Sequence, residues 1–157
     1  MNKYVSVISI FLLSLCIITQ NAGAEGLFGL GLISGEPTGV SAKYWTGTNT
    51  AIDGGIAWSF AEDAHLHIHA DWLHHNWSFL KEKFEVEQGE IPLYYGIGGR
   101  IRFDDDARVG ARFVFGMAYI WDNAPFDVFL EIAPILDLTP ETEVNGNIAI
   151  GLRYWFK

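Results

Sequence analysis

Three histidines and an aspartate at alternate positions are the residues of this chain best suited to binding a metal: His65, His67, His69 and Asp71. Residues two apart in a strand share a face and lie about 7 Å apart, so two imidazoles at that spacing can share a zinc ion. A site at these histidines needs a further ligand from a neighbouring strand, for which Asp53 is a candidate. The competing interpretation is a polar row without metal, because an i, i+2 series alone does not define a ligand geometry.

A second set of residue types suits nucleophilic hydrolysis. Ser59 or Ser78 can act as a nucleophile, His75 as its base and Asp71 as the group that orients the base. No compact motif brings these residues within hydrogen-bond reach, so ordinary polar residues at turns and rims are the competing interpretation. The sequence therefore predicts no catalytic residue, and an enzyme stays an alternative.

Two further patterns match ligand-binding motifs only in part. Gly96-x-Gly98-Gly99 lies inside a strand pattern and opens no helix, so it lacks the backbone cradle that a phosphate needs. Glycines at such positions relieve crowding or permit bending in a barrel wall. Asp104-Asp105-Asp106 has no EF-hand spacing after it and indicates a solvated acidic turn. We expect no cofactor.

The elements that must position these side chains are strands. Turn residues and period-2 alternation predict eight of them, at 27–35, 38–46, 50–60, 64–78, 91–103, 107–120, 126–137 and 145–156. Their connections are mostly short, so sequential strands should pair as antiparallel hairpins. The connection after the fourth strand is the longest. We therefore also consider that this strand continues through Phe84 or Val86, with its turn near Gln88-Gly89.

The two faces of these strands differ in a way that predicts which face is inside. In the last strand, Ile150 and Leu152 alternate with Gly151 and Arg153, and most other strands show the same contrast. Small residues on a face bathed in water would serve no purpose, whereas the interior of an eight-stranded barrel is only wide enough for side chains. We therefore expect the small and charged residues inside and the large apolar residues outside, towards lipid, as in outer-membrane barrels.

Charged residues on the inward face should form a network. Unpaired charges in so narrow a lumen would cost several kcal/mol each, so cations and carboxylates should pair and plug the lumen, leaving no open pore. The predicted members are Lys43, Asp53, Asp71, Arg100, Arg102, Arg108, Arg112, Asp127, Glu131, Asp137 and Arg153.

Aromatic residues near the strand ends or on the outer face fit the girdles that barrels place at the two membrane interfaces. These residues are Trp45, Trp58, Trp72, Trp77, Tyr95, Tyr119, Trp121, Tyr154 and Phe156. The alternative is that they form the core of a soluble β-sandwich.

Residues 1–24 have the pattern of a cleaved signal peptide. Lys3 supplies a positive charge, residues 5–18 are mostly apolar, and Ala22-Gly23-Ala24 fits the cleavage site. The apolar run is short for a membrane-spanning helix, so the mature chain either crosses a membrane as a closed barrel or is a soluble envelope protein. The net charge of −9 argues against sequence-independent nucleic-acid binding. The single cysteine, Cys16, leaves with the signal peptide, which suits an oxidising compartment.

The C-terminal pattern Gly151-x-x-Tyr154-x-Phe156 resembles the terminal-strand signal that the insertion machinery of bacterial outer-membrane barrels reads. Here Lys157 follows the aromatic residue, and Ala149 stands where that family usually has a polar residue. Three further stretches resemble a group of small outer-membrane barrels of unassigned function: residues 35–39, 93–100 and 136–140. The resemblance covers nearly all of the mature chain. It implies a barrel similar to the OmpA/OmpX type, and it implies no reaction.

The sequence thus predicts one domain over residues 25–157, an all-β, eight-stranded, antiparallel up-and-down transmembrane barrel. We expect a monomer in the outer membrane with a structural or surface-interaction role. Its expected partners are outer-membrane lipid, lipopolysaccharide and the insertion machinery, and not nucleic acid. The alternatives are a lipid A-modifying enzyme, acylase or deacylase, and a soluble periplasmic binder similar to lipocalins.

Overall fold

The computed structural model of the chain describes residues 26–36, 38–58, 66–84, 88–103 and 107–157. Several sequence predictions lie outside the described residues: the signal peptide at 1–24, Ser59, His65 and the acidic turn at 104–106. No helix in the described part of the chain is long and apolar enough to cross a membrane.

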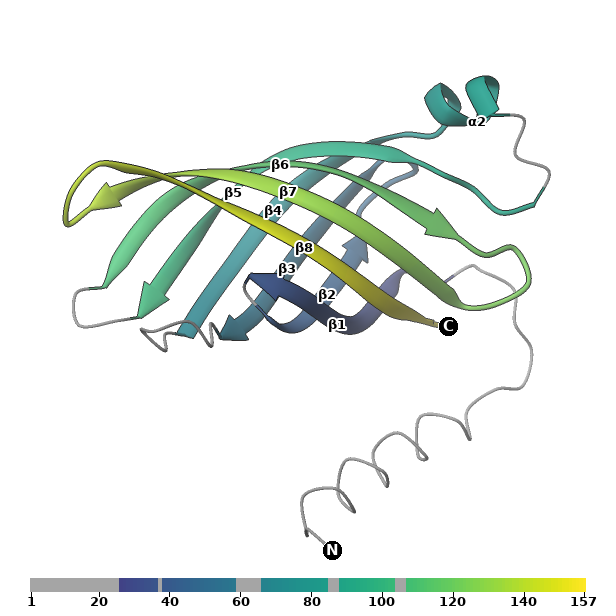
Figure 1. Ribbon diagram of the computed structural model, residues 1–157. Helices are drawn as coiled ribbons and strands as arrows, with labels where there is room; N and C mark the ends of the chain where they lie inside the picture. The colour runs from purple at the N-terminus through teal and green to yellow at the C-terminus, as the bar shows by residue number, and fades with distance from the viewer. Residues whose placement is uncertain (1–25, 37, 59–65, 85–87, 104–106) are drawn as a thin grey trace, which may run out of the picture.

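Eight strands and one short helix make up the described chain. They are β1 (Phe28–Glu36), β2 (Thr38–Trp45), β3 (Thr50–Trp58), β4 (Leu66–Asn76), α2 (Ser78–Phe84), β5 (Leu93–Phe103), β6 (Arg108–Ile120), β7 (Phe126–Thr139) and β8 (Glu143–Phe156). Each strand pairs antiparallel with the next, and β8 pairs with β1, so the sheet closes into a barrel (Figure 1). The predicted all-β, eight-stranded antiparallel up-and-down barrel is confirmed. Closure removes the free edges that an open sheet would expose.

The first and last strands bring both ends of the barrel chain to one rim. Phe28 at the start of β1 is paired with Phe156 at the end of β8. We call this rim the termini end. The helix α2 and the C-terminus lie at this same end of the barrel (Figure 1). The ends of β2, β4 and β6 and the starts of β3, β5 and β7 therefore lie at the termini end as well, since the strands alternate in direction.

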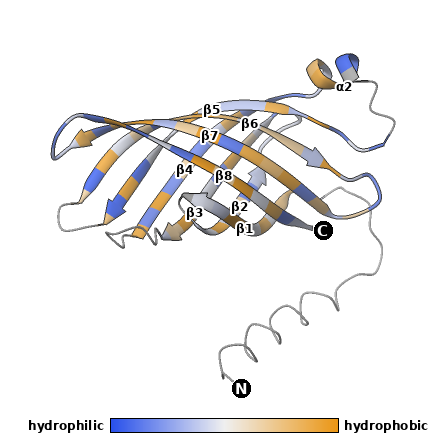
Figure 2. Ribbon diagram, viewed as in Figure 1, coloured by the Kyte–Doolittle hydropathy of each residue, from blue (hydrophilic) through white to orange (hydrophobic). Residues whose placement is uncertain are grey.

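The two faces of the sheet are chemically opposite. Along β7, Leu130 and Ile132 are exposed on the outside, whereas Phe129, Glu131 and Ala133 are buried inside. The other strands also turn exposed large apolar side chains outward, and the hydropathy of the ribbon alternates accordingly (Figure 2). The prediction that the apolar face lies outside is confirmed.

Small residues on the inner face make room for large ones that cross the lumen. A Cβ atom at Gly151 would collide with the ring of Phe129, and one at Gly116 would collide with the ring of Tyr94. Both rings come from the neighbouring strands, because Gly151 is paired with Phe129 and Gly116 with Tyr94. The glycines therefore define where aromatic side chains can turn inward.

The extension of the fourth strand through Phe84 is wrong. β4 ends at Asn76, and α2 follows it. The side-chain Oδ1 of Asn76 accepts hydrogen bonds from the backbone N–H groups of Ser78, at 3.2 Å, and of Phe79, at 3.1 Å. This is the N-cap arrangement that starts a helix, and it satisfies donors that a strand would have to pair with a neighbour. The longest connection therefore stays at the termini end.

Candidate functional site

The described interior holds ionic side chains from seven of the eight strands. Four cations and five carboxylates are buried there: Lys43, Arg100, Arg112, Arg153, Asp53, Asp71, Asp127, Glu131 and Asp137. Among the side chains that the structure describes, β1 contributes none of these. Near-equal numbers of the two signs allow each charge a partner, which buried ions require.

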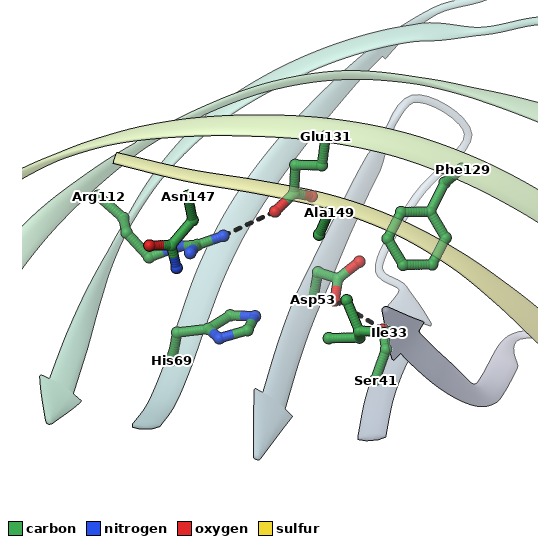
Figure 3. Close-up of a pocket in the computed structure, with 9 residues that line it drawn as sticks. All are labelled: Ile33, Ser41, Asp53, His69, Arg112, Phe129, Glu131, Asn147 and Ala149. Carbon is green, nitrogen blue, oxygen red and sulfur yellow. Dashed lines mark hydrogen bonds and ion pairs between the residues drawn. The ribbon is translucent and has the colours of Figure 1, made fainter. Parts of the chain in front are cut away.

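One cluster at mid-barrel is centred on Arg112 of β6. Its Nε donates to both carboxylate oxygens of Asp71, at 3.2 and 3.1 Å. Its Nη2 donates to Oε1 of Glu131 at 2.6 Å, as Figure 3 shows. The hydroxyl of Tyr94 donates to the other oxygen of Glu131 at 3.2 Å. The cluster joins β4, β5, β6 and β7 across the lumen.

A second cluster is centred on Arg153 of β8. Its Nη1 donates to Oδ2 of Asp53 at 2.5 Å, and its Nε donates to Oδ1 of Asp127 at 3.1 Å. The indole N–H of Trp155 donates to the remaining oxygen of Asp127 at 2.9 Å. The guanidinium carbon also lies 4.0 Å from the ring centre of Phe129, a cation–π contact. The bonds leave Arg153 surrounded by partners on several sides.

A third pair lies near the rim opposite the termini end. Arg100 donates to both oxygens of Asp137, at 3.1 and 2.6 Å, and the side-chain amide of Asn145 donates to Asp137 at 2.7 Å. Arg108 is half-buried, and its Nη1 pairs with Glu143, whose side chain is 50% exposed. Its position next to the β5–β6 connection explains this, since a residue at a strand end reaches the rim. Arg102 is half-buried.

The lumen is closed at the termini end by Lys43 and aromatic rings. Lys43 Nζ lies 2.8 Å from Nε2 of His75, and it lies 4.9 and 4.8 Å from the ring centres of Trp45 and Tyr94. Trp45 in turn stacks on Trp155, with 5.9 Å between ring centres. Together these side chains cap the ionic clusters beneath them.

Four tryptophans line a hollow of about 320 Å³ at this mouth. They are Trp45, Trp77, Trp121 and Trp155, and Gly26, Glu90, Ile120 and Asp122 complete the lining. The prediction that Trp45 and Trp77 belong to an outer girdle is wrong, because their rings lie 5.5 Å apart beside the 5%-exposed Trp155. The alternation of the strand could have predicted this position, because Trp45 stands two residues after Lys43 and so lies on the same inward face.

The row of histidines does not assemble a metal centre within the described residues. His67 and His69 are buried with their rings 5.2 Å apart and perpendicular, and no group of three metal-binding side chains gathers in the described part of the chain. The carboxylates of Asp71 and Asp53 are bonded to arginines, so neither is oriented towards a metal held by histidines. The hypothesis that His65 contributes lies outside the described residues.

The hydrolytic arrangement through Ser78 is not formed. The Ser78 hydroxyl donates to Asn76 Oδ1 at 3.3 Å, His75 is engaged with Lys43, and Asp71 is bonded to Arg112. These three side chains therefore belong to three different interactions and cannot pass a proton along one path.

The ionic middle of the barrel leaves little free space. A cavity of about 10 Å³ lies between Arg112, Glu131 and the second cluster, large enough for about one water molecule. Figure 3 shows its lining: Ile33, Ser41, Asp53, His69, Arg112, Phe129, Glu131, Asn147 and Ala149. A cavity of this size holds no organic ligand.

The residues of the predicted C-terminal signal lie on the strand that closes the barrel. Gly151 is buried against Phe129, whereas Tyr154 and Phe156 are half-buried on the other face of β8. Tyr154 packs on Phe126, with 5.3 Å between ring centres, and Phe156 packs on Phe28 at 6.0 Å. No protein-family model matches the chain, and no curated protein or solved structure matches it either.

Proposed function

We propose that this protein is a monomeric integral outer-membrane β-barrel whose lumen is sealed by ion pairs, with a structural or surface-interaction role. The observation that carries the proposal is the inverted distribution of side chains. Large apolar residues surround the barrel, and arginines bonded to carboxylates fill it. In this proposal the outer surface is in contact with lipid and the turns with lipopolysaccharide or other surface partners.

The inversion fits a bilayer better than water. A soluble monomer rarely exposes a contiguous apolar patch of more than a few hundred Å², whereas here apolar side chains cover the outside of every strand. The strands contain 8–14 residues, a span that includes the roughly 9–11 residues that a tilted strand needs to cross the hydrocarbon layer. A closed barrel also satisfies its backbone groups internally, as a membrane requires.

The sequence supports the same location. Residues 1–24 have the pattern of an export signal, and the terminal strand carries Gly151, Tyr154 and Phe156 in the order that resembles the insertion signal of outer-membrane barrels. A chain with both features would be exported and then inserted. As part of this proposal, the barrel is similar to the small barrels of the OmpA/OmpX type that the sequence resembles.

The two alternatives have less support. A soluble lipocalin-like binder needs an apolar interior that can hold a ligand, and this interior holds ion pairs and a cavity of about 10 Å³. A lipid A-modifying enzyme needs a nucleophile and a base in contact, and His75 is engaged with Lys43 while Ser78 is bonded to Asn76.

Membrane fractionation with surface proteolysis tests the location. We expect the full chain in the outer-membrane fraction, resistant to extraction by alkaline carbonate, and running faster on a denaturing gel before heating than after. Recovery in the soluble periplasmic fraction would refute the proposal. Mass analysis of lipid A from a deletion strain tests the enzymatic alternative, which unchanged acyl chains would discount.

Planar bilayers test the sealed lumen. The purified chain should show no stable large openings, because Lys43, Arg112 and Arg153 each bond to a partner on a non-adjacent strand. Stable conductance of the size expected for a water-filled eight-stranded lumen would contradict the sealed interior while leaving the membrane location intact.

A further inference from the structure

A groove of about 480 Å³ runs along the outside of the barrel beneath α2. Its floor consists of two rows that cross three strands in register: Leu93, Met117 and Leu130 lie nearer the termini end, and Tyr95, Phe115 and Ile132 lie deeper. Apolar atoms dominate the lining, and its volume is in the range of small-molecule sites. Such a groove can hold a hydrocarbon chain.

The helix α2 forms the overhang of this groove. Asn76 caps the helix, and Leu80 is buried to 8% exposure, so two contacts hold α2 against the barrel. The same turn leaves Phe79 54% exposed and lining the groove together with Tyr95 and Phe115. An exposed phenylalanine over an apolar floor is costly in water and favourable in the boundary between acyl chains and headgroups.

Charges of both signs stand next to the overhang. Glu82 and Lys83 follow Phe79 by three and four residues, so both lie on the same side of the helix as Phe79. Lys81 has its own partner, Glu90, at 3.9 Å. Both Glu82 and Lys83 are exposed. A ligand that places an apolar chain in the groove would therefore present its polar end to one ammonium and one carboxylate.

We propose that the groove and α2 bind one glycerophospholipid with an amine headgroup, of the phosphatidylethanolamine type. One acyl chain lies over the two apolar rows, the phosphate contacts Lys83, and the headgroup ammonium contacts Glu82. A zwitterionic headgroup fits the adjacent opposite charges better than a purely anionic one does. The inference rests on the proposed function, since the lipid reaches the groove from the bilayer.

The geometry also predicts the leaflet. In a barrel with an even number of strands both termini face the periplasm, so α2 lies at the inner leaflet. The two rows extend from α2 towards the middle of the barrel, which is the direction that an acyl chain takes from its headgroup.

Native mass spectrometry of the full chain, released from nanodiscs of equal phosphatidylethanolamine and phosphatidylglycerol, tests this site. We expect one retained phospholipid, with the amine lipid enriched over its bulk fraction. Lys83→Gln should lower occupancy by about fivefold, equivalent to about 1 kcal/mol. Glu82→Gln should remove the preference for phosphatidylethanolamine. The matched control is Lys157→Gln, an exposed lysine at the same end, which should change neither value.

A second pair of variants tests the apolar part of the proposed lipid site. Phe79→Ala should lower occupancy, and Phe103→Ala, which removes an exposed ring at the end of β5 away from α2, should not. Heat-dependent gel migration checks that each variant is folded. A wild-type chain that retains no phospholipid, or retains lipopolysaccharide or phosphatidylglycerol instead, overturns this site. Failure of the wild type to enter the membrane fraction would instead overturn the proposed function.

Discussion

Arg153 and Asp53 are 100 positions apart in the chain, and their side chains meet with 2.5 Å between Nη1 and Oδ2. Arg153 belongs to β8 and Asp53 to β3, two strands with β1 and β2 between them in the barrel. The ion pair therefore crosses the lumen, whereas the bond from Arg153 to Asp127 joins neighbouring strands. One guanidinium thus links β8 both to the neighbouring strand β7 and to β3 across the lumen.

Arg153→Met should destabilise the barrel strongly. The change leaves Asp53 and Asp127 buried without their cation, and breaking a buried pair in this way costs about 3–5 kcal/mol. Urea-induced unfolding in lipid vesicles measures the difference. Arg108→Met is the control: its pair with Glu143 is exposed at the rim, so its loss should cost at most about 1 kcal/mol. Equal losses for both variants would contradict the central role of Arg153.

Removing a whole cluster should cost less than removing one member of it. Arg112→Met alone leaves Asp71 and Glu131 unpaired, whereas Arg112→Met combined with Asp71→Asn and Glu131→Gln leaves no uncompensated charge. We expect the triple variant to recover at least half of the stability lost by the single variant, because neutral isosteres avoid the desolvation penalty of buried ions. The same unfolding measurement applies, and a triple variant less stable than the single one would contradict this account.

The sequence predicted the fold because alternation determines which face each residue takes. Gly151 and Arg153 alternate with Ile150 and Leu152, and only one orientation places the small and charged residues in a narrow interior. The same alternation predicted which charged residues lie on the inner face. Their partners did not, because the pairing of Arg153 with Asp53 depends on barrel closure, which brings together strands far apart in sequence.

Two features needed the structure because they depend on local contacts outside the strand pattern. The start of α2 depends on hydrogen bonds to the side chain of Asn76. In the sequence, Asn76 fits equally well as a polar residue of a strand. The tryptophan mouth combines Trp45, Trp77 and Trp155 from three segments of the chain. Alternation within the predicted strand at 38–46 would have placed Trp45 on the inner face, but it would not have predicted the stacking of Trp45 on Trp155.

Gly151→Val should impair folding, and Gly146→Val should not. Both glycines lie in β8, but a side chain at Gly151 meets the ring of Phe129 and the backbone oxygen of Leu32, whereas one at Gly146 has only Ala133 at 4.0 Å. Overpacking of this kind costs about 1–3 kcal/mol. Refolding of the purified chain into vesicles, without insertion machinery, separates this steric effect from any role of Gly151 in the insertion signal. An unimpaired Gly151→Val variant would show that Phe129 can move aside.

Quenching by brominated phospholipids distinguishes tryptophans on the outside of the barrel from those in its mouth. Trp58 and Trp72 are 42% and 50% exposed on the outer face, whereas Trp155 is 5% exposed beside Trp45. Bromine atoms on the acyl chains quench only rings that they approach closely. In a barrel that spans the bilayer, Trp72→Phe should therefore reduce the quenchable part of the fluorescence, and Trp155→Phe should leave it unchanged.

If Trp155→Phe produced the larger reduction, lipid would have access to the interior and the proposed orientation of the wall would be wrong. If no tryptophan were quenched in a reconstituted sample, the outer face would not be in contact with acyl chains, and the membrane proposal would fail on a measurement that does not depend on fractionation.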